Sequence, residues 1–452
     1  MTGPAGTRAE RFAAAVATYE QRTPASARLA VEARQWLPGG DSRATLHHEP
    51  YPVFLDRSRA NRVVDVDGND YIDLTGNHSA LVHGNRPTPV VDAVIDQLGR
   101  GTCFPAPTSP QVDFARELVN RVPSLDAVRF ANSGTEATMH AIRGARAATG
   151  RHRIAKAEGG YHGSQDDVFV SIHPTSADAG PIDRPTSGPK SQGLRRGTLD
   201  DTLVLPFNRP DDAVALIEGA GADLAAVLVE PVMGSAGMLA ADDGYLVALR
   251  EATTAVGALL ILDEVITFRL APGGAQELMG LQPDITCYGK MIGGGLPLGA
   301  FGGRADVLDL YDPTGDGPEV VHSGSLNANP LSLVAGLAAV RALTPGAIVE
   351  LNGRGDRLRA GWAAAAASVG VPLTVTGRGS LLGLHFTAGP VRDIRDTWAE
   401  DRALGHAVFL SLLNEGVLID PRGVSCLSTA TTDQDVAAAV GTFEAVLTRL
   451  LR

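Results

Sequence analysis

The stretch ITCYGKMIGGGLPLGAFGG, residues 285–303, sets one lysine, Lys290, between a short apolar run and a segment rich in glycine. The run ITCYG has the length and composition of a strand buried in a sheet. A lysine desolvated at the end of such a strand has a lowered pKa and becomes a nucleophile for carbonyl groups, whereas a surface lysine does not. The glycines at 293–295 let the backbone approach a bound ligand closely. The stretch therefore predicts a buried strand that ends in a reactive lysine beside a ligand.

The glycine-rich stretch does not match the motifs of other common sites. A nucleotide-binding P-loop needs a glycine at position 284 and Ser or Thr after the lysine, but the chain has Asp284 and Met291 there. No serine has glycine two residues before and two after it, so the nucleophile turn of the α/β-hydrolases is absent. No HExxH motif and no paired His/Cys spacing is found, so no metal site is expected.

Length and composition are those of a globular protein. At 452 residues, 44% hydrophobic and 20% charged, the chain has room for two or three domains. Its net charge of -12 argues against a nucleic-acid partner, which requires a basic surface. The longest apolar run, AVGALLIL, has eight residues, far below the roughly 20 of a membrane span, so no membrane partner is expected.

The cysteines and the first residues bear on location. Cys103, Cys287 and Cys426 lie far apart with no CxxC spacing, so neither a disulfide framework nor a zinc knuckle is predicted. The first 30 residues carry six charged side chains, which interrupt the apolar core that a signal peptide needs. The expected location is the cytoplasm.

The pattern along the chain predicts an α/β fold. Short apolar runs alternate with helical stretches from about residue 86 to 305, as in βαβ units, and this predicts a mostly parallel sheet covered on both faces. We expect an N-terminal helix and hairpin segment at 1–85, a large domain at 86–340 and a small C-terminal domain at 341–452.

Two N-terminal elements and one long loop are also predicted. Residues 7–36 are expected to form a helix, and Asp67-Gly68-Asn69 a hairpin turn. The polar segment 173–202 has no periodicity and is interpreted as a lid over a site, with a disordered insertion as the alternative.

Residues that follow the apolar runs form a chemically coherent set, since ligands bind at the carboxyl ends of strands in α/β sheets. Ser133-Gly134-Thr135 opens a helix and suits an anion such as phosphate, or is simply a helix cap. Tyr161 and His162 suit stacking on a flat ring, or are core aromatics. Asp263-Glu264 ends an apolar run and is expected to face a cation, or is a cap or surface pair. With Lys290, these are the four groups that pyridoxal phosphate requires.

Several motifs resemble those of a known family. NSGTEA, YHG, EPV, LDEV, GKMIGGGLPLGAFGG and HSGSLNANP are similar to motifs of the class III (subgroup II) pyridoxal-phosphate-dependent aminotransferases. The likeness runs from about residue 38 to the end, and is strongest to the branch that holds glutamate-1-semialdehyde aminomutase and the β-amino-acid transaminases. It implies fold type I: a large domain with a mostly parallel seven-stranded sheet, and a smaller α+β domain built from the N- and C-terminal segments.

The resemblance also implies roles for individual residues. Lys290 would form the Schiff base with pyridoxal 5'-phosphate and later move the substrate proton, and Asp263 would hold the ring nitrogen protonated. Val265 and Tyr161 would pack on the two ring faces, with His162 next to Tyr161. The remaining cofactor contacts would come from Ser133, Gly134, Thr135 and Glu230, and from Ser325, which would reach the phosphate of a neighbouring subunit. A homodimer with shared active sites is therefore expected.

Two arginines are candidates for binding substrate carboxylates. Arg43 lies in LPGGDSRATLHHEPYP and Arg422 in LIDPRGVSCLS, and both segments are similar to segments of β-amino-acid transaminases. A guanidinium fork suits a carboxylate, and a surface salt bridge is the alternative for each arginine. Asn77 and His78, in a segment expected to shape the pocket, differ from the residues of both relatives.

These observations predict a ping-pong transaminase that moves an amino group between an amino acid, with β-amino acids among the candidates, and a 2-oxo acid. A glutamate-1-semialdehyde 2,1-aminomutase, which needs no external amino acceptor, is the first alternative. A pyridoxal-phosphate-fold protein without turnover is the second, and the presence of Lys290 and Asp263 argues against it.

Overall fold

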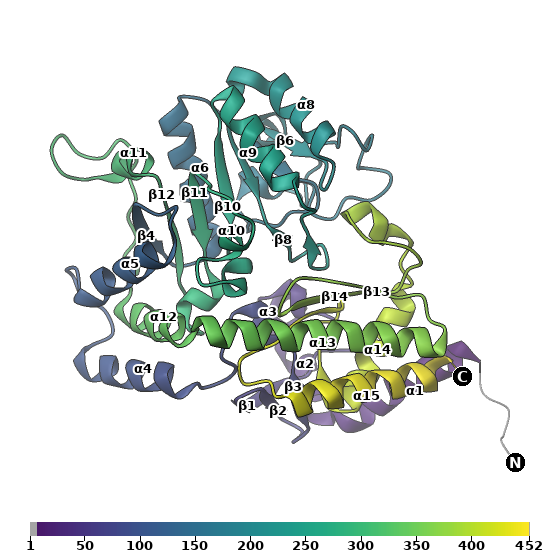
Figure 1. Ribbon diagram of the computed structural model, residues 1–452. Helices are drawn as coiled ribbons and strands as arrows, with labels where there is room; N and C mark the ends of the chain where they lie inside the picture. The colour runs from purple at the N-terminus through teal and green to yellow at the C-terminus, as the bar shows by residue number, and fades with distance from the viewer. Residues whose placement is uncertain (1–6, 452) are drawn as a thin grey trace, which may run out of the picture.

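The computed structural model describes residues 7–451. Its centre is a seven-stranded sheet in the order β4-β12-β11-β10-β7-β5-β6, drawn in the upper half of Figure 1. Only β12 runs antiparallel to its neighbours, so the predicted mostly parallel seven-stranded sheet is confirmed. The strands are β4 (Ala127–Ala131), β5 (Arg153–Ala157), β6 (Thr202–Leu205), β7 (Leu224–Val229), β10 (Leu259–Asp263), β11 (Ile285–Tyr288) and β12 (Gly299–Gly303).

Helices bury this sheet because its central strands are apolar on both faces. Every residue of β7, β10 and β11 is buried, as expected for parallel strands covered on two sides. Helix α6 (Gly134–Thr149) packs on β11 and β12, α9 (Tyr245–Val256) packs on β7 and β10, and α8 (Pro210–Ala220) lies against α9. The packing of these helices fixes the carboxyl ends of the parallel strands at one edge of the sheet.

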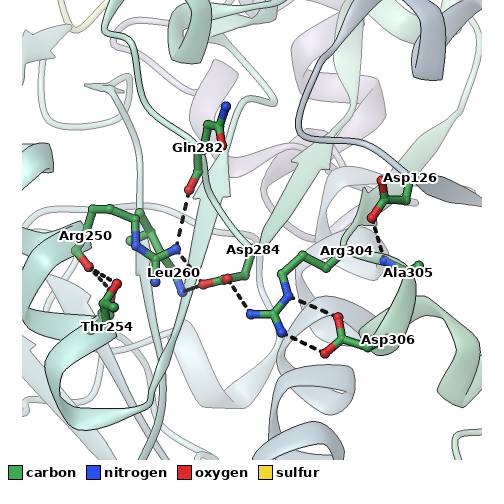
Figure 2. Close-up of polar contacts among 10 residues, drawn as sticks. Asp126, Arg250, Thr254, Leu260, Gln282, Asp284, Arg304, Ala305 and Asp306 are labelled. Carbon is green, nitrogen blue, oxygen red and sulfur yellow. Dashed lines mark hydrogen bonds and ion pairs between the residues drawn. The ribbon is translucent and has the colours of Figure 1, made fainter.

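A buried carboxylate anchors the start of the lysine-bearing strand. Asp284, just before β11, accepts hydrogen bonds from the Leu260 amide at 2.7 Å, from Arg250 at 2.6 Å and from Arg304 at 2.9 Å (Figure 2). Arg304 also forms a forked pair with Asp306. These contacts tie β10, β11 and β12 together at the end opposite Lys290.

The rest of the chain forms a smaller α+β part from both ends of the sequence, as predicted. Strands β1 (Leu55–Arg59), β2 (Arg62–Asp65) and β3 (Asp70–Asp73) continue into β15 (Val417–Leu418), which pairs in parallel with β3. Strands β13 (Thr374–Thr376), β14 (Leu381–His385) and β16 (Val424–Cys426) form a second sheet. Helices α1 (Arg8–Arg22), α13 (Pro345–Val369), α14 (Arg402–Asn414) and α15 (Asp433–Leu451) pack in the lower half of Figure 1. The domain boundaries at residues 85 and 340 stay a prediction.

The single helix predicted for residues 7–36 is wrong in detail. The chain forms α1 and α2 (Pro24–Ala33), which break at Thr23 because Pro24 lacks the N–H that would continue α1. The turn predicted at Asp67-Gly68-Asn69 does join β2 to β3 as an antiparallel pair.

The remaining helices are α4 (Thr88–Arg100), α5 (Ser109–Arg121), α7 (Arg196–Asp201) and α12 (Pro330–Ala342). The single helical turns are α3 (Gly76–Ser79), α10 (Ala275–Leu278) and α11 (Ala305–Leu308). The two-residue strands β8 (Val232–Met233) and β9 (Leu239–Ala240) pair with each other.

The segment 173–202 packs against the C-terminal part of the chain. Trp398 donates a hydrogen bond to the carbonyl of Pro174 at 2.9 Å, and Arg395 donates one to the carbonyl of Gly180 at 2.9 Å. Arg395 is itself paired with Glu158, just after β5, at 2.7 Å. The segment therefore has defined contacts, and its role as a lid stays a prediction.

Within residues 7–451, no single helix is long and apolar enough to span a membrane. Helices α12 and α13, with a bend of 78° between them, are long and apolar enough only when taken together, by length and composition alone.

Candidate active site

Lys290 stands where β11 ends and the short helix η6 (Lys290–Gly293) begins, in a left-handed backbone conformation with φ of 47°. Residues other than glycine rarely adopt this conformation, and strained residues of this kind cluster at functional sites. Burial lowers the pKa of its amino group, while Asp263 and Glu230 act in the opposite direction. Across residues 7–451 the amino group has no hydrogen-bond or ion-pair partner, which leaves it available to react.

The glycines around Lys290 allow β11 and β12 to lie against the Ser133-Gly134 turn. A Cβ atom on Gly289 would lie 3.2 Å from the Gly134 Cα, and one on Gly299 would overlap the Ser133 carbonyl. Side chains at these positions would push the turn and the lysine apart. The glycine-rich sequence is thus required for the close approach of two functional segments.

The Ser133-Gly134-Thr135 turn has the properties of a phosphate site. Ser133 caps α6, its Oγ accepting from the Glu136 amide at 3.2 Å, so the helix-cap interpretation is also correct. The amides of Gly134 and Thr135 have no acceptor in the described part of the chain. Free amides at the positive end of a 16-residue helix favour an anion.

Gly163 supports the same turn from the other side. Its φ is 94°, and a Cβ there would lie 2.7 Å from the Thr135 Cα and overlap its hydroxyl. We expect Gly163→Ala to lower the free energy of unfolding by about 1–3 kcal/mol and to weaken the binding of pyridoxal phosphate. Gly68→Ala is the control, because Gly68 also has a positive φ but has open space around it. Thermal unfolding and cofactor titration check this, and equal effects of both variants would contradict it.

The acidic pair at the end of β10 serves two separate purposes. The buried Asp263 carboxylate accepts from His162 Nδ1 at 2.8 Å and from the Val265 amide at 3.0 Å. Burial lowers the pKa of His162, and a proton on Nδ1 serves the hydrogen bond to Asp263, because a carboxylate can only accept. Glu264 instead accepts from Thr267 and from two amides of α10, and it holds that turn in place. His162 is therefore a positioning residue for Asp263.

Tyr161, Glu230 and Val265 surround the same region. Tyr161 is 39% exposed, and its amide donates to Glu230 Oε2 at 2.9 Å. Burial, followed by the nearby Asp263, raises the pKa of Glu230 well above its usual range. Val265 packs on the phosphate turn, since a Cβ on Gly134 would lie 3.0 Å from a Val265 methyl group. The predicted ring contacts of Tyr161 and Val265 are compatible with these positions and stay a prediction.

The two candidate arginines differ in their partners. Arg43 is exposed, donates to Asn77 Oδ1 at 2.8 Å and makes no ion pair with any described residue. It lines a cavity of about 590 Å³ and lies close enough to Lys290 for its charge to lower the pKa of that residue. Arg422 is paired with Asp420 and lines a different cavity, of about 390 Å³.

Ser325 lies apart from these residues. It is exposed on the segment between β12 and α12, and its carbonyl is 3.9 Å from the Cys103 sulfur. Among the contacts of residues 7–451, none links it to the Ser133 turn of its own chain. This position is compatible with the predicted contact to a neighbouring subunit.

Sequence reasoning missed the geometry of the turn α3. Gly76, Asn77, His78 and Ser79 all have positive φ, between 48° and 72°, and this left-handed turn packs against η6 beside Lys290. It directs Asn77 to Arg43, and His78 to Asp420 at 3.3 Å. Asp420 was also missed; the signal for it was an acidic residue two positions before a candidate arginine. No cluster of three or more His, Cys, Asp or Glu placed for a metal occurs within residues 7–451.

Residues 44–447 match the family model for aminotransferase class III. The chain belongs to this family. It is 40% identical over 417 residues to glutamate-1-semialdehyde 2,1-aminomutase of Methanothermobacter thermautotrophicus, covering 92% of this chain and 96% of the relative. It is 39% identical over 438 residues to the β-phenylalanine transaminase of Variovorax paradoxus, covering 96% of each.

This class-III aminotransferase also resembles solved structures throughout. The ω-transaminase of Sphaerobacter thermophilus superposes with a TM-score of 0.91 at 44% identity, covering 94% of this chain and 98% of that one. Solved relatives hold pyridoxal 5'-phosphate or its amine form, and pyridoxal 5'-phosphate is the cofactor of this enzyme. Its fold is type I, and it transfers an amino group between an amino acid and a 2-oxo acid.

The residues present fit this cofactor. The amides at the start of α6 suit its phosphate, the anionic Asp263 suits a protonated ring nitrogen, and the unpartnered Lys290 amine suits its aldehyde. His162 fixes the Asp263 carboxylate from behind. The four groups predicted from the sequence are thus brought together in one site.

Proposed function

We propose that this aminotransferase takes its amino group from a β-amino acid that carries one carboxylate and an apolar substituent. The observation that carries the proposal is Arg43, whose guanidinium has no carboxylate partner within the described chain and acts electrostatically on Lys290. An arginine whose charge reaches the reacting amine and that is free of ion pairs is a natural anchor for the substrate carboxylate.

The cavity lined by Arg43 supports an apolar substituent. Its volume of about 590 Å³ is enough for a small aromatic or branched amino acid, and much of its wall is aliphatic or aromatic. The apolar residues that line it are Leu37, Leu46, Val53, Phe54, Leu55, Val63, Leu81, Phe409, Leu413, Leu418 and Ile419. The similarity to a β-phenylalanine transaminase agrees with such a substrate.

Lys290, Asp263 and Arg43 have separate roles in the proposed reaction. Pyridoxal phosphate, when bound, supplies an electron-withdrawing ring that carries the amino group between the two half-reactions. Lys290 Nζ, with its pKa lowered by burial, would take the proton from the substrate carbon that bears nitrogen and carry it until it is transferred onward. Asp263, oriented by His162, would accept a hydrogen bond from the ring nitrogen. Arg43 holds the substrate carboxylate in register with Lys290.

We also propose a cytoplasmic homodimer whose active sites are shared. The exposed Ser325 lies on a segment with the exposed apolar side chains Val321 and Leu326. Phe104, beside Cys103, is exposed as well. An apolar surface around a predicted phosphate contact supports burial against a second copy. Sedimentation velocity tests this, and a monomer that binds the cofactor with full occupancy would contradict it.

A half-reaction tests the proposed function most directly. Cofactor-loaded protein is mixed with α-amino acids, β-amino acids or glutamate semialdehyde, without acceptor, while the cofactor absorbance and released oxo acid are measured. Stoichiometric oxo acid from β-amino acids supports the proposal. Isomerisation of the semialdehyde alone, with no oxo acid from any amino acid, would overturn the proposal in favour of the aminomutase alternative, since the chain is also 40% identical to the Methanothermobacter aminomutase.

Arg43→Ala is expected to raise KM for carboxylate-bearing donors about ten- to hundredfold, because a charge-assisted pair is lost. An amine without a carboxylate, such as 1-phenylethylamine, should be affected far less. Steady-state kinetics of both substrates checks this, with the exposed Arg59→Ala as control variant. Equal losses for both substrates would remove Arg43 from carboxylate recognition.

A further inference from the structure

Arg422, unlike Arg43, already holds a carboxylate of its own chain. Its Nε lies 2.9 Å from Asp420 Oδ1 and its Nη2 lies 3.1 Å from Asp420 Oδ2, a forked pair. The amide of Arg422 also donates to Asp420 Oδ1, at 2.8 Å. This turn therefore presents the guanidinium as part of a neutral pair, whose attraction for another carboxylate is weak.

Removing Arg422 from Asp420 would leave a buried charge without compensation. The Asp420 side chain is 2% exposed and that of Arg422 is 37% exposed. Among the Lys, Arg and His side chains of residues 7–451, the other one within 4 Å of the Asp420 carboxylate is His78, at 3.3 Å. Burial lowers the pKa of His78, so near neutral pH it does not replace the positive charge of Arg422. A buried carboxylate that loses its cation is strongly destabilised.

The pair stands at the wall between two cavities. Asp420 lines the cavity of about 590 Å³ together with Arg43, whereas Arg422 lines the one of about 390 Å³. Ile419 and Pro421 line both. A substrate with one carboxylate on Arg43 and a second carboxylate directed across this wall would meet Arg422 only in competition with Asp420.

We propose that Asp420 is a specificity-determining residue, which withholds Arg422 from substrates and makes the enzyme select amino and oxo acids with one carboxylate over those with two. The inference rests on the proposed function, because it concerns the substrates of that site. It assigns to Asp420 the role of an internal competitor for the second carboxylate. The role requires the negative charge of Asp420 and the guanidinium of Arg422.

Asp420→Asn in the cofactor-loaded enzyme tests this. The amide keeps an oxygen for the Arg422 backbone but removes the charge. Isothermal titration calorimetry with the unreactive glutarate and valerate, which differ by one carboxylate, should show glutarate binding tightened by about tenfold or more and valerate nearly unchanged. The dicarboxylate acceptor 2-oxoglutarate should show a lower KM relative to pyruvate.

Three further variants make the test decisive. Asp420→Ser should tighten glutarate binding as Asp420→Asn does, so a folding defect in one of the two variants does not decide the result. Arg422→Gln in the Asp420→Asn background should abolish the gain. Asp306→Asn breaks the forked pair of Arg304 and Asp306, which has the same two-residue spacing and lies outside both cavities. This variant should change the binding of neither glutarate nor valerate.

The outcomes separate this inference from the proposed function. Equal changes for glutarate and valerate, or none, overturn the role of Asp420 even if the half-reaction proceeds. Loss of the half-reaction in the wild-type enzyme, together with a glutarate gain in Asp420→Asn, overturns the proposed function and retains Asp420 as the group that masks Arg422.

Discussion

We expect Lys290→Ala to abolish amino transfer and to lower the rate of the half-reaction by at least about 10⁴-fold. Lys290 is the unpartnered amine at the end of β11, and its removal takes away both the covalent attachment and the proton carrier. Reduction with borohydride followed by peptide mass spectrometry should find the cofactor on Lys290 in the wild type and nowhere in the variant. Stopped-flow absorbance measures the remaining rate.

The chain offers a matched control for this experiment, because it has three lysines, Lys156, Lys190 and Lys290. Lys156 is fully buried, and burial lowers its pKa to about 7, but its amine donates to the carbonyls of Ala157 and Val170. Lys156→Met should keep the label on Lys290. A label on Lys156, or turnover by Lys290→Ala, would refute the assignment.

Asp263→Asn should slow the half-reaction about 10²- to 10³-fold, with a smaller effect on the amount of folded protein. The reason is that an amide cannot supply the negative charge that keeps the ring nitrogen protonated, although it still accepts the His162 proton at 2.8 Å. Single-turnover kinetics on fully loaded enzyme measures the effect separately from cofactor loss.

The neighbouring carboxylate is the control for Asp263. Glu264 is equally buried but receives its hydrogen bonds from Thr267 and from the amides of Ala275 and Gln276. Glu264→Gln should therefore lower the free energy of unfolding by about 1–3 kcal/mol, without a comparable change in the half-reaction rate. Similar kinetic losses in both variants would show that Asp263 has no special role.

Local sequence predicted most of the sheet and the cofactor site. The strands β4, β7, β10 and β11 are the apolar runs. Ser133, Tyr161 and Lys290 each follow a strand or a short turn after it, and Asp263 is the last residue of β10. Such features are readable because parallel strands are apolar throughout and because ligand-binding residues gather at their carboxyl ends. The family likeness then supplied the roles that position alone leaves open.

The partners of these residues depended on the tertiary structure. The sequence contains Asp263-Glu264 as an acidic pair, but only packing directs one carboxylate to His162 and the other to α10. In the same way, Arg43 and Arg422 have equal standing as sequence candidates. In the folded chain, Arg43 has no ion pair with a described residue, whereas Arg422 forms an ion pair with Asp420.

The sequence by itself thus determined the α/β class and the cofactor, and it predicted the lysine and the phosphate turn, because these depend on runs of neighbouring residues. The tertiary structure decided which arginine is available and how His78 and Asn77 meet Asp420 and Arg43 from a left-handed turn. The physical reason is that ion pairs and hydrogen bonds between distant segments are set by packing and burial, which no local pattern encodes.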